Sequence, residues 1–257
     1  MSAQNGWRTR LAGSYWVWRA YHALIADAVA IQRPTKFRIV HEFLNGNLGV
    51  VADIGCGPGV FTRYLCAHAD QVWAADIDRQ SLERVRSRHR DERNLSFLVT
   101  EAGRLPFRDS RLDSVLYLEI LEHIQDDAGA VREVWRVLRP GGRLVLSVPV
   151  PPGEIDDERT SPWGHKREGY QLAGIRTLLE SHGFQVQQHR FAQFRFSRLG
   201  ENLVRQWRRL LRLPAPILLG WIGYLDFLLD EKKRQEGGYD PANVVILATK
   251  LGDLSSR

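Results

Sequence analysis

Residues 50–59 read VVADIGCGPG, an apolar run that passes directly into a loop with three glycines. Glycines at positions 55, 57 and 59 let the backbone turn sharply and approach a ligand closely, because glycine adopts positive φ without steric cost. The helix predicted next, over residues 61–69, offers free backbone N–H groups at its start. A strand, a glycine-rich loop and a helix in this order are typical of the nucleotide site of an open α/β sheet.

Two carboxylates near this loop, Asp53 and Asp76, indicate which chemical groups a ligand must carry. The glycine spacing differs from Gly-x-Gly-x-x-Gly, since the third glycine comes one residue early, and this weakens a dinucleotide interpretation. Asp53 can accept a hydrogen bond from an ammonium group. Asp76 follows the predicted strand 71–75, where a carboxylate can bind both hydroxyls of a ribose. Asp78 is better placed than Asp76 to cap the next helix, so the pattern favours a nucleoside that carries an ammonium group.

Strands and helices alternate along the rest of the chain, and this favours a parallel, doubly wound α/β sheet. Apolar spacing predicts helices over 14–44 and 198–237 as well. The predicted strands cover 50–54, 71–75, 95–99, 112–118, 143–148, 184–190 and 243–250, and the predicted helices between them cover 61–69, 79–90, 128–138 and 170–182.

Four segments, read together, resemble class I S-adenosylmethionine-dependent methyltransferases. VVADIGCGPGVFTRYL resembles the first motif of that family, and VWAADID resembles its second-strand acid. TEAGRLPFRDSRLDSVLYLEILEHIQD and VLRPGGRLVLSVP resemble the segments around the fourth and fifth strands. The four segments follow the family's order within residues 48–190.

The resemblance implies a seven-stranded Rossmann-like sheet whose last strand is antiparallel, with N-terminal helices and a helical insertion before that strand. It implies a single methyltransferase domain over residues 1–257. Within this domain we expect an N-terminal helical lid at 1–47, a core at 48–190, a helical cap at 191–240 and the last strand at 241–250.

The resemblance also implies S-adenosylmethionine as cofactor and S-adenosylhomocysteine as product. It assigns the methionine moiety to Asp53 and the glycine loop, the ribose to Asp76, and the adenine to Ile77 and the Glu101-Ala102 pair. The family usually has Asp where this chain has Glu101. The residues expected to bind the cofactor are Asp53, Gly55, Cys56, Gly57, Gly59, Asp76, Ile77, Glu101, Ala102 and Glu119.

The reacting side needs little from the protein, because a sulfonium already activates the methyl group and catalysis rests on alignment and water exclusion. A base helps when the acceptor is a hydroxyl, and we expect His123 and His165 to be the catalytic residues. Glu119, Glu122 and His123 stand at i, i+3 and i+4, so a helical turn would place them on one side. With His165 they would form a magnesium site.

This glutamate–histidine pattern is similar to that of ubiquinone-biosynthesis O-methyltransferases and of small-RNA 3′-end 2′-O-methyltransferases. In many other family members, however, Leu-Glu-His binds no metal. Without a metal, His123 would act through a hydrogen bond, act as a base, or have a purely structural role. We therefore expect no metal here and keep the magnesium site as the alternative.

The net charge and the composition indicate which partners and which cellular location to expect. The net charge of +6 favours anionic partners, or reflects an arginine-rich solvated surface. Residues 198–230 join a basic amphipathic segment to an apolar one, which fits a lid, a homodimer face or peripheral membrane contact. The apolar part, 216–229, is short for a membrane span. Two cysteines without a pairing framework, and no signal-like N-terminus, predict a cytoplasmic protein that is membrane-peripheral if 198–230 binds lipid.

The leading hypothesis is methyl transfer to a small acceptor, apolar or lipid-linked, at an oxygen atom. One alternative is a metal-dependent RNA 2′-O-methyltransferase. Nucleic acid is disfavoured as a partner because no recognised RNA-binding module is present and the arginines alternate with core-type residues. The other alternative is a non-catalytic scaffold that binds the cofactor, which the intact Asp53, glycine loop and Asp76 argue against.

Overall fold

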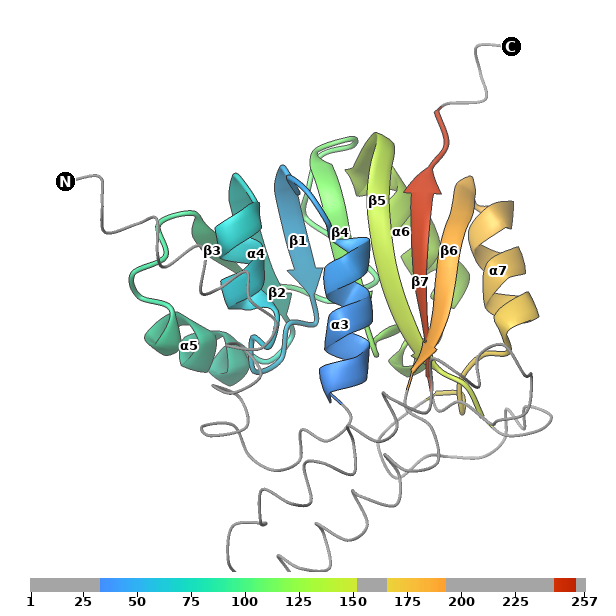
Figure 1. Ribbon diagram of the computed structural model, residues 1–257, viewed down its shortest axis with the longest axis horizontal. Coiled ribbons are helices and arrows are strands. Elements are labelled where there is room, and N and C mark those ends of the chain that lie inside the picture. Colours follow the sequence, from blue (N-terminus) through green and yellow to red (C-terminus); the bar gives the residue numbers. More distant parts are fainter. Residues whose placement is uncertain (1–32, 152–165, 193–242, 253–257) are drawn as a thin grey trace, which may run out of the picture. The chain divides into compact units, whose positions relative to one another are not determined.

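The computed structural model describes residues 33–151, 166–192 and 243–252 (Figure 1). The chain divides into two compact units, 1–42 with 191–242 and 43–190 with 243–257. Helix α3 (Arg33–Phe43) lies almost entirely in the first unit. The second unit contains the candidate site and the other described elements, apart from residues 191 and 192.

Seven strands form one sheet in the order β3-β2-β1-β4-β5-β7-β6 (Figure 1). β1 to β5 pair in parallel, and β7 is antiparallel to β5. The fold predicted from the sequence is therefore confirmed, including the antiparallel last strand. The strands are β1 (Val50–Ile54), β2 (Gln71–Asp76), β3 (Leu95–Val99), β4 (Leu112–Leu118), β5 (Leu138–Pro149), β6 (Phe184–Ala192) and β7 (Asn243–Lys250).

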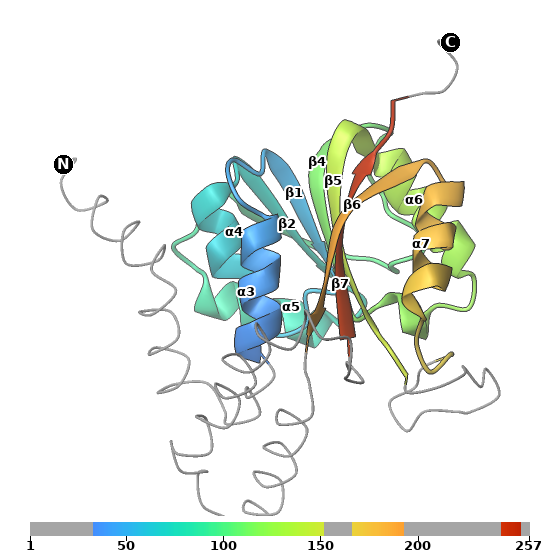
Figure 2. The same ribbon diagram turned by 45° about the vertical axis from the view of Figure 1, so that its right-hand side comes forward.

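Helices cover both faces of this sheet, which is why its central strands are apolar on both sides. Figure 2 shows α4 and α5 on one side and α6 and α7 on the other. The side chain of Asp78 accepts from the backbone N–H groups of Gln80 and Ser81, and thereby caps α5 as predicted. The helices are α4 (Thr62–His68), α5 (Arg79–Arg88), α6 (Asp127–Val137) and α7 (Leu172–Ser181), with a 3-10 turn, η2 (Leu121–His123), before α6.

β5 begins five residues earlier than the predicted start at Arg143. Leu138 pairs with Leu112 and Arg143 pairs with Ser114, so residues 139–142 bulge out between two paired stretches. Gly141 adopts φ +75 in this bulge, and the Arg139 guanidinium contacts the Asp113 carboxylate. The Arg-Pro-Gly-Gly segment thus makes the predicted turn inside a strand, because both of its flanks find partners on β4.

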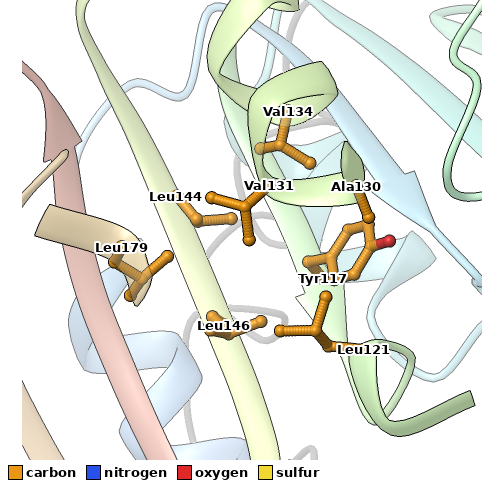
Figure 3. Close-up of a pocket in the computed structure, with 8 residues that line it drawn as sticks. All are labelled: Tyr117, Leu121, Ala130, Val131, Val134, Leu144, Leu146 and Leu179. Atoms are coloured by element: carbon orange, nitrogen blue, oxygen red, sulfur yellow. The ribbon is translucent and has the colours of Figure 1, made fainter. Parts of the chain in front are cut away.

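A small cavity of about 10 Å³ lies between the sheet and helices α6 and α7 (Figure 3). Its walls are apolar, so it has too few polar partners to hold a water. It is a gap in the core packing and not a ligand site. Tyr117 is the one lining residue with a polar side-chain atom, and its hydroxyl donates a hydrogen bond to the Ala102 carbonyl oxygen. The cavity is lined by Tyr117, Leu121, Ala130, Val131, Val134, Leu144, Leu146 and Leu179.

Several expectations fall outside the described residues. These are most of the proposed lid (1–32), the proposed cap (193–242) with the segment 198–230, and His165. No helix within the described ranges is long and apolar enough to span a membrane.

Candidate functional site

The glycine loop follows β1 at the carboxyl edge of the sheet, where the ends of β2 and β4 also lie. Its three glycines have φ values of +68, +49 and +72, at Gly55, Gly57 and Gly59. A Cβ on Gly55 would collide with the side chain of Ile120, whereas a Cβ on Gly57 would have no atom within 4 Å. The loop is therefore packed at Gly55 against the residues that follow β4, and it faces open space at Gly57. That space is where a ligand can approach the backbone.

Cys56 and Gly59 face the protein interior. The Cys56 side chain is buried in a cluster with Ala74, Leu82 and Val85, and burial raises the pKa of its thiol well above the usual range. A Cβ on Gly59 would meet Val85 at 2.9 Å, so this glycine allows the loop to pack closely on α5. Contact of Cys56 with a ligand would therefore come from its backbone and not from its sulfur.

Asp76 ties the loop to the end of β2. One carboxylate oxygen accepts from the Gly57 N–H at 2.8 Å, and the other accepts from the Asp78 N–H at 2.8 Å. The Cys56 N–H also donates to the Ala75 carbonyl at 3.0 Å. Each carboxylate oxygen of Asp76 retains acceptor capacity after these bonds. Asp76 can thus hold the loop and accept from two ligand hydroxyls at the same time.

Asp53 is a buried acid at the end of β1, with 4% of its surface exposed. Burial, and then the negative charge of Asp76, raise the pKa of Asp53 to about 7. No hydrogen bond joins its carboxylate to another residue in the described part of the chain. A buried carboxylate beside a second one is stabilised by a cation, because the cation offsets both desolvation and repulsion. The pair therefore suits a ligand that carries an ammonium group.

Two exposed apolar side chains lie next to Asp76, one after it in the chain and one on the neighbouring strand β3. Ile77 is 69% exposed and Val99, at the end of β3, is 49% exposed. The Thr100 N–H donates to the Asp76 carbonyl at 3.1 Å, so the segment after β3 starts beside Asp76. Exposed apolar side chains next to a carboxylate suit a planar ring that is linked to a ribose. Val99 was missed from the sequence, although it is the last residue of a strand at the ligand edge.

Glu119, the first residue after β4, has a backbone conformation that is unusual for a residue with a side chain. Its φ is +56, which costs about 1–2 kcal/mol. The Ser147 hydroxyl donates to one of its carboxylate oxygens and the Asn243 amide to the other, both at 2.6 Å. Its own N–H donates to the Ser147 carbonyl at 2.9 Å. Ser147 and Asn243, from β5 and β7, were missed from the sequence.

The expectation that Glu119, Glu122 and His123 lie on one side is wrong. The left-handed turn at Glu119 breaks any helix through this segment, and η2 begins only at Leu121. Glu122 is 1% exposed, whereas His123 is exposed. Among the described residues, which do not include His165, no group of three or more His, Cys, Asp or Glu side chains could hold a metal ion.

Residues 166–170 dock the segment after β5 against this turn. The Lys166 N–H donates to the Glu122 carbonyl at 2.8 Å. The Arg167 guanidinium lies 2.7 Å from the Asp127 carboxylate, which also accepts from the Tyr170 hydroxyl at 2.9 Å. The chain that follows position 165 is thereby fixed beside Glu122. Asp127 and Tyr170 carry no local sequence signal, because their pairing joins positions far apart in the chain.

Residues 52–146 match the family model of a methyltransferase domain. The chain is 36% identical over 115 residues to "Methyltransferase GfsG" of Streptomyces halstedii, covering 43% of this chain and 41% of that protein. It is 38% identical over 122 residues to "27-O-demethylrifamycin SV methyltransferase" of Amycolatopsis mediterranei, covering 44% of each. The matches therefore span less than half the length of these two relatives.

Solved structures share the fold. The "[4+2]-Cyclase SpnF" superposes with a TM-score of 0.59 at 22% identity, covering 84% of this chain and 82% of that one. "N-methyltransferase NodS" of Bradyrhizobium japonicum gives a TM-score of 0.57 at 15% identity, covering 86% and 97%. This strand order and the matched domain are the features of class I S-adenosylmethionine-dependent methyltransferases. Residues 52–146 of this chain match a methyltransferase domain, and the sheet has the strand order of that class.

A pair of alanine substitutions tests the packing of the loop. Gly55→Ala and Gly57→Ala both place a side chain at positive φ, which costs about 1–2 kcal/mol each. Only Gly55→Ala also displaces Ile120, so we expect it to lower the free energy of unfolding by about 1–3 kcal/mol more than Gly57→Ala. Urea denaturation measures both. Adding Ile120→Val should recover part of the difference, and equal losses in the two variants would contradict the packing.

Asp53→Asn should change how stability depends on pH. Because folding raises the pKa of Asp53 from 3.8 to about 7, the protonated group favours the folded state. This contribution is fully present below about pH 4 and is lost as the pH rises to about 7. At about pH 8 the buried charge destabilises the free protein by up to about 4 kcal/mol, at 1.36 kcal/mol per pKa unit.

We therefore expect Asp53→Asn to be more stable than the wild type at about pH 8, and the two to become nearly equal at about pH 4. Urea denaturation of both proteins over this range measures the difference. A stability difference that does not change with pH would show that Asp53 keeps its ordinary pKa in the folded protein.

Proposed function

We propose that this protein transfers a methyl group from S-adenosylmethionine to a small acceptor. The observation that carries the proposal is the arrangement of Asp53 and Asp76 around the open face of Gly57. A buried, uncompensated carboxylate suits an ammonium group. A carboxylate already aligned by two backbone N–H groups suits a pair of ribose hydroxyls. One ligand that carries both groups, and an adenine to cover Ile77, is S-adenosylmethionine.

Bound S-adenosylmethionine supplies a methyl group activated by a sulfonium sulfur. In this proposal Asp53 and the backbone of residues 55–59 hold the methionine moiety. Asp76 binds the ribose, and Ile77 with Glu101 and Ala102 surrounds the adenine. These groups bind and orient the cofactor and leave the chemistry to the alignment of the acceptor.

For the acceptor we propose a small apolar or lipid-linked molecule that is methylated at an oxygen atom. The acceptor hydroxyl would receive the activated methyl group and would lose its proton to a base. His123 and His165 are the proposed bases. The matched relatives include a 27-O-demethylrifamycin SV methyltransferase and a demethylmenaquinone methyltransferase from Tropheryma whipplei. Their names support a small organic acceptor.

The Glu119 carboxylate supports the same assignment from the protein side. Ser147 and Asn243 fix it at the carboxyl edge, in the turn that also places Ile120 against Gly55. A strained residue held in this way is typical of a functional site. We propose that Glu119 borders both the methionine moiety and the acceptor. A metal-dependent reaction on RNA has no support within the described residues, since Glu122 is buried, His123 is exposed, and no group of three such side chains could hold a metal ion there. Lipid contact through 198–230 and a homodimer remain proposals.

Calorimetry with S-adenosylhomocysteine tests the cofactor assignment. We expect the wild type to bind it, and Asp76→Ala to bind at least about tenfold more weakly, or about 1.4 kcal/mol, because the ribose and the glycine loop lose one shared anchor. Asp70→Ala, an exposed acid just before β2, serves as the control and should bind like the wild type. A folded wild type that binds no S-adenosylhomocysteine would contradict the proposed function.

A further inference from the structure

The segment between β3 and β4, residues 100–111, is held in place by side chains that lie outside the proposed ligand site. The Tyr117 hydroxyl from β4 donates to the Ala102 carbonyl at 3.2 Å. From α6, the Arg136 guanidinium donates to the Leu105 carbonyl at 2.9 Å and to the Phe107 carbonyl at 2.8 Å. Three carbonyl and carboxylate groups of this segment are thus fixed by α6, because Arg136 also donates to Asp109 at 2.6 Å.

Glu133, one turn earlier on α6, completes this contact. Its carboxylate accepts from Arg136 at 2.8 and 2.7 Å and from the Leu105 N–H at 2.8 Å. The bonds from Arg136 lower the pKa of Glu133 and keep it charged. All five N–H groups of Arg136 are used. An ordinary ion pair on a helix surface needs none of the four bonds that Glu133 and Arg136 make to the segment. This pair therefore acts on the segment and not only on α6.

The other end of the same segment carries the proposed adenine-binding residues. Thr100 is bonded to Asp76 through its N–H, and its hydroxyl donates to the Arg104 carbonyl at 2.8 Å. The Arg104 N–H closes a turn to the Glu101 carbonyl at 3.1 Å. The turn of residues 100–104 therefore lies between two fixed points, Asp76 and Leu105, and Glu101 and Ala102 lie inside it.

We infer that Tyr117, Glu133 and Arg136 form a clamp that positions the 100–105 turn for adenine without touching the ligand. This inference rests on the proposed function. The clamp holds the turn in its binding geometry before the ligand arrives, so no affinity is lost to ordering it. If a variant leaves the turn in that geometry for only a tenth of the time, the apparent dissociation constant rises about tenfold.

The test compares two ligands, S-adenosylhomocysteine and 5′-methylthioadenosine, which keeps the adenine and ribose but lacks the amino-acid portion. We expect Arg136→Gln to weaken both ligands by the same factor, about tenfold. Tyr117→Phe, which removes one neutral hydrogen bond, should weaken both about threefold. Asp53→Asn, in contrast, should weaken S-adenosylhomocysteine and leave 5′-methylthioadenosine unchanged.

Two control variants on α6 separate positioning from general destabilisation. Arg132→Gln removes an exposed arginine that lies 3.9 Å from Asp126 and makes no hydrogen bond or ion pair to the described residues 100–111. Val134→Ala removes buried surface at the cavity of Figure 3 and lowers the melting temperature. Both controls should bind the two ligands within about twofold of the wild type.

Hydrogen exchange of the ligand-free protein gives a second readout that does not depend on binding. We expect Arg136→Gln to speed exchange of the Leu105 and Arg104 amides, and Val134→Ala to leave their rates, relative to global unfolding, unchanged. Clamp variants that bind both ligands like the wild type, with unchanged exchange, would overturn the inference while leaving the proposed function intact. Failure of the wild type to bind either ligand, with the exchange result as expected, would overturn the proposed function and the adenine role of the turn, and leave only a structural clamp.

Discussion

Two carboxylates, Asp53 and Asp76, are held near each other where β1 and β2 end, and much of the site is arranged around their repulsion. Asp76 is stabilised by the backbone N–H groups of Gly57 and Asp78. Asp53 is buried and has no such compensation from the described residues, so its pKa rises to about 7. The free protein thus carries an acid that is poorly solvated when charged. A cationic ligand relieves this cost, so binding and the charge of Asp53 are linked.

Ligand binding can offset the free energy of unfolding that several features of the site cost the free protein. The buried acid and the left-handed Glu119 both lower the stability of the free protein, and the three loop glycines lose more backbone entropy on folding than other residues would. They occur together at the carboxyl edge of one sheet. The surrounding structure holds them in place through long-range contacts: Ile120 packs on Gly55, and Ser147 and Asn243 fix Glu119. Packing and hydrogen bonds that hold such residues in a fixed geometry are what a preorganised binding site requires.

The sequence predicted the sheet and the glycine loop well because their determinants are local. β1, β3, β4 and β7 have the predicted limits, since each is a short apolar run bounded by polar or turn residues. Asp78 was recognised as a cap from its position alone. The bulge at residues 139–142 was missed in part, because its flanks pair with β4 and this pairing depends on tertiary contacts.

The reacting side was less predictable for the same reason. The spacing of Glu119, Glu122 and His123 suggested one helical face, but the left-handed conformation of Glu119 depends on partners more than twenty residues away. Glu133 and Arg136 have the spacing of an ordinary ion pair on a helix surface, and nothing local indicates that they bind the 100–111 segment. Val99 is hidden in a strand pattern that fits a buried residue equally well. The part of the site that was not predicted depends on contacts between residues far apart in the chain, and sequence periodicity does not encode such contacts.

The most direct test of the account is proton release when S-adenosylhomocysteine binds. Near pH 6 Asp53 is protonated in the free protein if its pKa is about 7, and the ligand's ammonium group requires it charged. Calorimetry in buffers of different ionisation enthalpy should then show release of close to one proton, and Asp53→Asn should release none. Heats that do not depend on the buffer, from a wild type that binds the ligand, would contradict the central role of the buried carboxylate.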